Sequence, residues 1–159
     1  MTEASRLVDH AQVWLNQVVA RFAEAGVALP AKQFIANSGM EGLSYDEELL
    51  AVSLQRLLVG TPGAEGDPGS GVYFPLMAEY GLTLLRCVPT TTKVSGLTAA
   101  QLNASAAEVL TDLSLVASAT NRAAVNGAWA CERVRVGGGN LVPPQGGIGG
   151  VLYRVTITI

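Results

Sequence analysis

The last nine residues of the chain alternate between two kinds of side chain, and this pattern constrains the fold more than any other feature. One set of alternate positions is large and apolar, and the other set is mostly polar. The apolar set is Val151, Tyr153, Val155, Ile157 and Ile159, and the other set is Leu152, Arg154, Thr156 and Thr158. A period of two with β-branched and aromatic residues is typical of a strand with one buried face. We therefore predict that these residues form a strand that is tied into a sheet.

Two helices are predicted from apolar residues at helical spacing. The first covers about Thr2–Ala25 and ends at the glycine that follows, and the second begins at Thr98 and ends at Asn126. Thr98 and Gln101 have the spacing of a capping box, which satisfies free backbone N–H groups at a helix start. The stripes expected to face the core are Leu7, Ala11, Trp14, Leu15, Val18 and Phe22, and then Leu102, Ala106, Val109, Leu113, Val116 and Thr120.

Further strands are predicted at Lys32–Asn37, Tyr45–Val59, Val72–Val88 and Ala128–Val136. Tyr45–Val59 is compatible with a strand or a helix, and we favour a strand because the β-rich segment Val72–Val88 follows it. Two stretches rich in glycine and proline, Gly60–Gly71 and Gly137–Gly150, are predicted as long loops, because these residues propagate neither helix nor sheet.

These elements predict a single α+β domain over residues 1–159. Two helices would pack on one face of a mostly antiparallel sheet, and the two glycine-rich loops would form the tips of hairpins. The last two strands follow each other in the chain, so we expect them to be antiparallel neighbours. The length of 159 residues suits one domain.

The composition disfavours several classes of protein. Apolar residues make up 49% and charged residues only 14%, which excludes a disordered chain. The net charge is −3, with eight Arg and two Lys, so the basic surface of a typical nucleic-acid binder is missing. No apolar run approaches the ~18–20 residues of a membrane span, and Met1–Arg6 does not resemble a signal peptide. High apolar content with low charge suggests that part of the surface contacts other subunits.

Residues that could support catalysis are sparse. The only histidine, His10, is expected on the surface of the first helix, and no G-x-S-x-G nucleophile motif is present. Gly137–Asn140 follows a strand, but no lysine and no helix follow it, so a phosphate-binding loop is not indicated.

Metal-binding patterns are equally weak. Asp46–Glu48 and the pair Glu65 and Asp67 lack the spacing of a calcium loop, and we interpret them as solvated acids. Cys87 and Cys131 have no paired Cys or His ligands, and we expect two reduced cysteines in strands. We therefore expect no cofactor, no metal ion and no enzymatic activity.

Two short motifs carry a family resemblance. Arg86-Cys87-Val88-Pro89 ends a strand before the long second helix, and Pro143-Pro144-Gln145-Gly146-Gly147 precedes the terminal strand. With the order of elements, these motifs resemble the tail terminator proteins of long-tailed (siphovirus-type) bacteriophages, especially those of actinobacteria. The likeness is strongest at Leu82–Pro89 and Pro143–Ile159. Members of that family often have Gly-Pro-Gln-Gly-Gly where this chain has Pro-Pro-Gln-Gly-Gly, and another cysteine near Ile148.

The resemblance implies a structural virion protein that forms a ring, usually of six subunits, at the head-proximal end of the tail. The implied partners are further copies of the chain, the major tail tube protein and a connector or stopper protein of the head–neck. The ring would cap the tube, stop its polymerisation and join tail to head, while DNA passes through the lumen without specific binding. The location implied is the tail–neck junction of the virion, and the host cytoplasm during assembly, without a membrane. Such proteins have no catalytic residues.

Contacts with neighbouring subunits or the tube are expected from the two glycine-rich loops and the polar residues near them. The candidate interface residues are Glu65, Asp67, Arg133, Arg135, Asn140 and Gln145. An alternative is another phage neck component, such as a head-completion or head–tail connector protein. A small enzyme is disfavoured by the single histidine, and a nucleic-acid binder by the isoelectric point of about 5.1.

Overall fold

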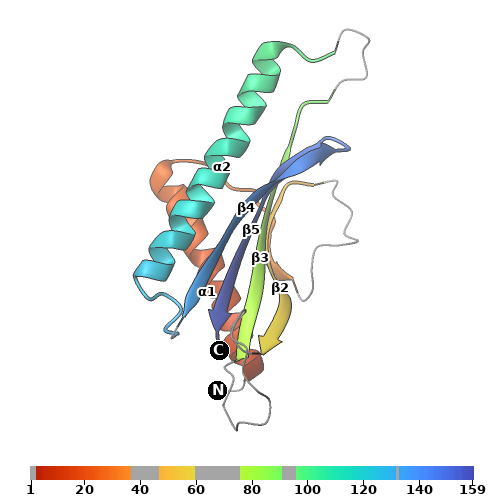
Figure 1. Ribbon diagram of the computed structural model, residues 1–159. Helices are drawn as coiled ribbons and strands as arrows, with labels where there is room; N and C mark the ends of the chain where they lie inside the picture. The colour runs from red at the N-terminus through yellow and green to blue at the C-terminus, as the bar shows by residue number, and fades with distance from the viewer. Residues whose placement is uncertain (1–2, 37–46, 60–75, 91–95, 132) are drawn as a thin grey trace.

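The computed structural model describes residues 3–36, 47–59, 76–90, 96–131 and 133–159 (Figure 1). The described elements, in chain order, are α1 (Glu3–Ala25), β1 (Gln33–Ala36), β2 (Leu49–Val59), β3 (Leu76–Cys87), α2 (Ala99–Val125), β4 (Val134–Gln145) and β5 (Ile148–Thr158). The predicted loop Gly60–Gly71 lies outside the described residues.

The five strands form one mixed sheet in the order β1-β2-β3-β5-β4. β1 runs parallel to β2, and every other neighbouring pair is antiparallel. The alternating C-terminal segment is therefore a strand, as predicted, and it lies inside the sheet between β3 and β4. Two partners bind its backbone, which explains why the C-terminal residues are held in the fold.

Both helices pack on the same face of this sheet (Figure 1), which confirms the predicted α+β class. The side chains of the helices and of that face form one core. Its largest members include Trp14, Val18, Phe22 and Val116 from the helices and Tyr80, Leu82, Leu84, Val155 and Ile157 from the sheet. The Trp14 indole nitrogen donates to the Thr120 hydroxyl at 2.9 Å, so the two helices also share a buried hydrogen bond.

The predicted helix ends are confirmed by their backbone geometry. Gly26 follows α1 with φ +68°, and the Val27 N–H bonds the Phe22 carbonyl at 3.0 Å, as in a Schellman motif. At the start of α2, the Thr98 hydroxyl accepts from the Gln101 N–H, and the Gln101 side chain accepts from the Thr98 N–H. The capping box read from the sequence is therefore formed.

Of the predicted strand Tyr45–Val59, the structure shows a strand from Leu49 to Val59, and the described residues Glu47 and Glu48 precede it. β2 pairs with β3 from Leu49 to Val59, with a register shift between Leu54 and Arg56. β1 falls inside the predicted strand Lys32–Asn37. The choice of a strand over a helix for this segment is therefore confirmed from Leu49 to Val59.

The prediction of a strand over Ala128–Val136 is wrong for its first part. The strand begins at Val134, and the residues after α2 form a turn in which Ala130 has φ +48°. Trp129 is buried at that turn, and its indole nitrogen donates to the His10 carbonyl at 3.0 Å. The residues after α2 are used to reverse the direction of the chain and to place Trp129 in the core. The strand therefore begins only after this turn.

The prediction of a loop over Gly137–Gly150 is also wrong. Strand β4 continues through Gln145, β5 begins at Ile148, and only Gly146 and Gly147 form the turn. Their φ values of +58° and +85° suit a two-residue hairpin turn that favours glycine. The second predicted tip is therefore a paired hairpin.

Glycine and proline are compatible with this hairpin because of their neighbours. A Cβ on Gly139 would lie 2.5 Å from Leu113 Cδ1 and 2.6 Å from Tyr153 Cδ2, so the missing side chain lets α2 approach the sheet. A Cβ on Gly150 would collide with the Leu84 carbonyl oxygen. The prolines lie in β4, an edge strand, where a missing N–H need not break a ladder bond.

Candidate interaction site

The described part of the chain contains no group of three or more His, Cys, Asp or Glu side chains placed to bind a metal ion.

Cys87 is an exposed free thiol at the end of β3, and Cys131 is a half-buried free thiol outside the strands. Burial raises the pKa of the Cys131 thiol. Of the two cysteines, both predicted in strands, only Cys87 lies in one. Of the helices described, neither has the length and apolar character needed to cross a membrane.

His10 is not the surface residue that the sequence suggested. Its imidazole makes an edge contact with the Tyr80 ring, with 6.4 Å between centroids, and its Nδ1 atom is buried without a hydrogen-bond partner. Burial lowers the pKa of His10, which favours the neutral imidazole. His10 therefore belongs to the packing between α1 and the sheet.

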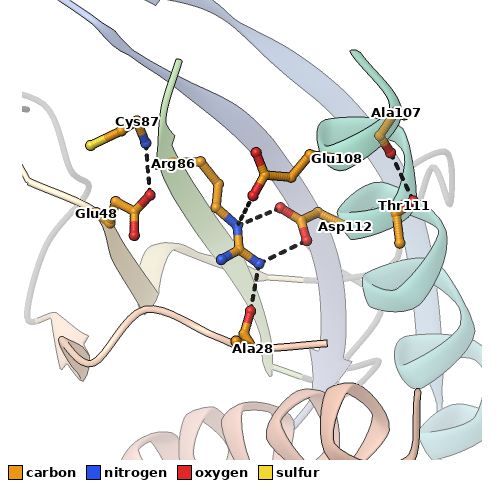
Figure 2. Close-up of polar contacts among 8 residues, drawn as sticks. All are labelled: Ala28, Glu48, Arg86, Cys87, Ala107, Glu108, Thr111 and Asp112. Atoms are coloured by element: carbon orange, nitrogen blue, oxygen red, sulfur yellow. Dashed lines mark hydrogen bonds and ion pairs between the residues drawn. The ribbon is translucent and has the colours of Figure 1, made fainter. Parts of the chain in front are cut away.

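A buried ion pair joins β3 to α2 (Figure 2). Arg86 Nε donates to Asp112 Oδ2 at 2.8 Å, and Arg86 Nη2 donates to Asp112 Oδ1 at 3.0 Å. Arg86 Nη2 also donates to the Ala28 carbonyl at 2.8 Å, and Glu108 Oε1 lies 4.0 Å from Arg86 Nε. The side chains of Arg86 and Asp112 are 7% and 1% exposed. This bidentate pair fixes α2, β3 and the segment after α1 relative to one another.

Asp112 marks the position where α2 enters the core. The buried residues of the helix all lie at or after it, and they are Asp112, Leu115, Val116, Ala119, Thr120 and Ala123. Leu102, the first member of the predicted core stripe, is 52% exposed. The expectation that the whole stripe faces the core is therefore wrong for the N-terminal half of α2.

An apolar groove of about 550 Å³ lies beside this exposed half of α2. Its lining includes Leu102, Ala106, Val109 and Leu110 from α2, Leu141, Val142, Pro143 and Pro144 from β4, and Val88, Pro89 and Leu97 from the segment between β3 and α2. None of the lining residues that the structure describes carries a charge. Leu102, Leu110 and Leu141 are 52%, 56% and 52% exposed, which is unusual for leucines gathered at one place.

The hairpin of β4 and β5 forms the wall of the groove opposite α2. Figure 1 shows the hairpin tip and the start of α2 at the same end of the molecule. The Val88 N–H donates to the Gly147 carbonyl at 2.7 Å, which ties the hairpin turn to the end of β3. The wall is therefore held by backbone bonds, while its prolines and Leu141 face the groove. The surface suits an apolar segment of another protein better than a small polar substrate.

Three of the six predicted interface residues lie on one strand. Arg135, Asn140 and Gln145 are exposed on β4, and their strand partners Thr156, Leu152 and Ile148 place all three on the face away from the helices. Arg133 is exposed just before β4. Glu65 and Asp67 lie outside the described residues. The described candidates therefore lie along the edge strand of the sheet or just before it, and the structure does not bring them into one site.

The groove itself was missed by the sequence interpretation. Leu110 lies outside the stripe predicted for α2, so one more apolar residue on that helix was the available signal. Leu141 was assigned to a loop, so its position opposite Leu110 was not foreseen. The chain matches no protein-family model and no curated protein sequence.

Proposed function

We propose that this chain is a structural virion protein, a ring-forming tail terminator of a long-tailed phage. In this role it caps the tail tube, stops the polymerisation of the tube and joins the tail to the head–neck. Its partners are further copies of itself, the tail tube protein and a neck protein.

The observation that supports this proposal most concerns the two segments that resemble tail terminators, Leu82–Pro89 and Pro143–Ile159. These two segments meet in the fold. Residues Leu82–Cys87 of β3 pair with Ile148–Tyr153 of β5, so the segments lie side by side. Beyond the paired residues, Val88 and Pro89 line the groove together with Pro143 and Pro144. The residues that resemble tail terminators therefore form one wall of the apolar groove, which is a surface suited to bind protein.

Burying the exposed leucines of the groove on association would contribute enough free energy to support assembly. Fully burying a leucine side chain contributes about 1.5–3 kcal/mol, so completing the burial of three half-exposed leucines contributes roughly 3 kcal/mol before the costs of association. Six copies in a ring would repeat this contact, so a modest contribution at each site is sufficient.

Electron microscopy of particles made without this protein tests the proposal. A terminator is required to stop tube growth, so its loss should give overlong tails that carry no head. Tails of normal length beside unjoined heads would instead assign the chain to another neck component, the head-completion or connector class. Normal, infectious particles would refute both assignments.

A pair of matched substitutions tests the groove. Leu110→Lys places a charge in the groove, while Val125→Lys places the same charge on an 85% exposed residue at the other end of α2. We expect both variants to fold, and only Leu110→Lys to fail to restore tails of normal length. Equal restoration by the two variants would show that the groove is not used.

A further inference from the structure

The first half of α2 has an apolar stripe that the described part of the chain leaves exposed. Leu102, Ala106 and Leu110 line the groove at intervals of four residues, so they lie on one side of the helix. The two leucines project beside the hollow that Leu141 borders from the β4 side. The surface therefore combines an apolar ridge and an apolar groove, which are the two parts of a helix-in-groove contact.

This surface is also almost free of charge. Residues 136–153, which contain most of the hairpin of β4 and β5, have no charged side chain, and residues 96–111 have only Glu108. Glu108 does not line the groove, and its carboxylate lies 4.0 Å from Arg86 Nε. A partner that covers the groove must be apolar and uncharged where it makes contact, because a charge buried there would find no opposite charge.

The spacing of the stripe makes it complementary to a second copy of itself. When two such helices cross in antiparallel directions at Ala106, Leu102 of each copy lies opposite Leu110 of the other, since both leucines are four residues from Ala106. The small side chain at the crossing allows the helix axes to approach to about 8 Å. In the same register Glu108 lies opposite Ala104 of the second copy, so the two like charges do not face each other.

From this match of spacing and charge we infer that, in the free protein, the first half of α2 from a second copy covers the groove in a two-fold dimer. Such a contact uses the same surface of both copies, so it differs from the head-to-tail contact of a closed ring. The inference therefore goes beyond the proposed function and concerns the protein before assembly. In the proposed function, a tail or neck protein then replaces the second copy in the groove.

The size of the groove predicts a weak dimer. A stable interface takes roughly 20–30 residues from each partner, whereas 14 described residues line the groove. We therefore expect the dimer to dissociate on dilution, as a contact that is later replaced requires. Nucleic acid is a poor occupant, because none of the described lining residues is basic and phosphate contacts need basic side chains.

Sedimentation velocity of the purified full chain over a range of concentrations tests the dimer. Wild-type protein should change from monomer to dimer as the concentration rises, with no larger species. Leu110→Lys should raise the dissociation constant about tenfold or more, because each copy loses a buried leucine and gains an unpaired charge. Val125→Lys places the same charge at the other end of α2 and should leave the dissociation constant unchanged. Circular dichroism checks that both variants are folded.

Disulfide crosslinking tests the register of the two helices, in a background with Cys87→Ser and Cys131→Ser. Ala106→Cys should form a covalent dimer by itself, because the two-fold axis places the residue opposite its own copy. Leu102→Cys should crosslink efficiently only when it is mixed with Leu110→Cys. Val125→Cys, on the exposed end of the same helix, should not crosslink.

Several outcomes would overturn the inference. These are a monomer at every concentration, species larger than a dimer, a dimer that Leu110→Lys leaves intact, or failure of Ala106→Cys to crosslink. A monomer that binds purified tail tube protein through Leu110 would assign the groove to that protein from the start. Each of these leaves the tail-length experiment able to support the proposed function. Normal tails in the absence of the protein would refute the function and leave a crosslinked dimer standing.

Discussion

Replacement of Asp112 by alanine should be among the most destabilising changes in this protein. Asp112 is 0% exposed and binds both Nε and Nη2 of Arg86. Without it, the buried guanidinium keeps the Ala28 carbonyl and Glu108, whose carboxylate lies 4.0 Å away and is 50% exposed. Breaking one side of a buried ion pair costs about 3–5 kcal/mol. Because two acceptors remain near Arg86, we expect a loss at the lower end, about 3 kcal/mol.

Urea unfolding followed by circular dichroism measures this loss directly. In a domain of this size, 1 kcal/mol corresponds to about 2–4 °C, so the melting temperature should fall by about 6–12 °C. Glu108→Gln removes the more distant, exposed carboxylate and should cost no more than about 0.5 kcal/mol. The double variant Arg86→Met, Asp112→Leu should recover most of the stability, because it leaves no buried charge. If Asp112→Ala lost less than about 1 kcal/mol, or no more than Glu108→Gln, the pair would not anchor α2 as argued.

Three other substitutions test separate parts of the fold. Gly150→Ala places a Cβ against the Leu84 carbonyl and should cost about 3 kcal/mol in urea unfolding, and a neutral result would contradict that close approach. Thr98→Ala removes the α2 N-cap and should cost about 1 kcal/mol, whereas Thr98→Ser keeps the hydroxyl and should stay within a few tenths. Burial lowers the pKa of His10 in the folded state, so the unfolded chain binds the proton more readily and stability should fall as the pH drops below the ordinary value of 6.5. His10→Gln should flatten this part of the pH profile, and an unchanged slope would assign it to another group.

The helices and the final strand were predictable because their signals are local. The capping box of Thr98 and Gln101 and the glycine after Ala25 act within a few residues of the helix ends that they define. The alternation of Val151–Ile159 requires only that one face of the strand be buried. Its central place in the sheet depends on β3 and β4, so that part came only from the structure.

Strand β4 was not predictable from local signals, because its glycines are required by contacts with residues that are distant in the sequence. Gly139 makes room for Leu113 of α2 and Tyr153 of β5, and neither contact is visible in the sequence around Gly139. Read locally, glycines with two prolines indicate a loop. In the folded chain the same residues make an edge strand that α2 can approach closely.

The groove shows a second limit of prediction from sequence. An apolar stripe on a helix does not reveal whether the same chain or a partner covers it. The spacing of Leu102, Val109 and Val116 is continuous, yet the core of the single chain reaches only the last of the three. Since Leu102 and Leu110 are more than half exposed, polar residues there would cost the isolated domain little stability. Their apolar character is therefore not explained by folding of one chain. It is explained if apolar side chains of a partner pack against the half of α2 that precedes Asp112. The groove would then be a surface that is buried only when the protein assembles.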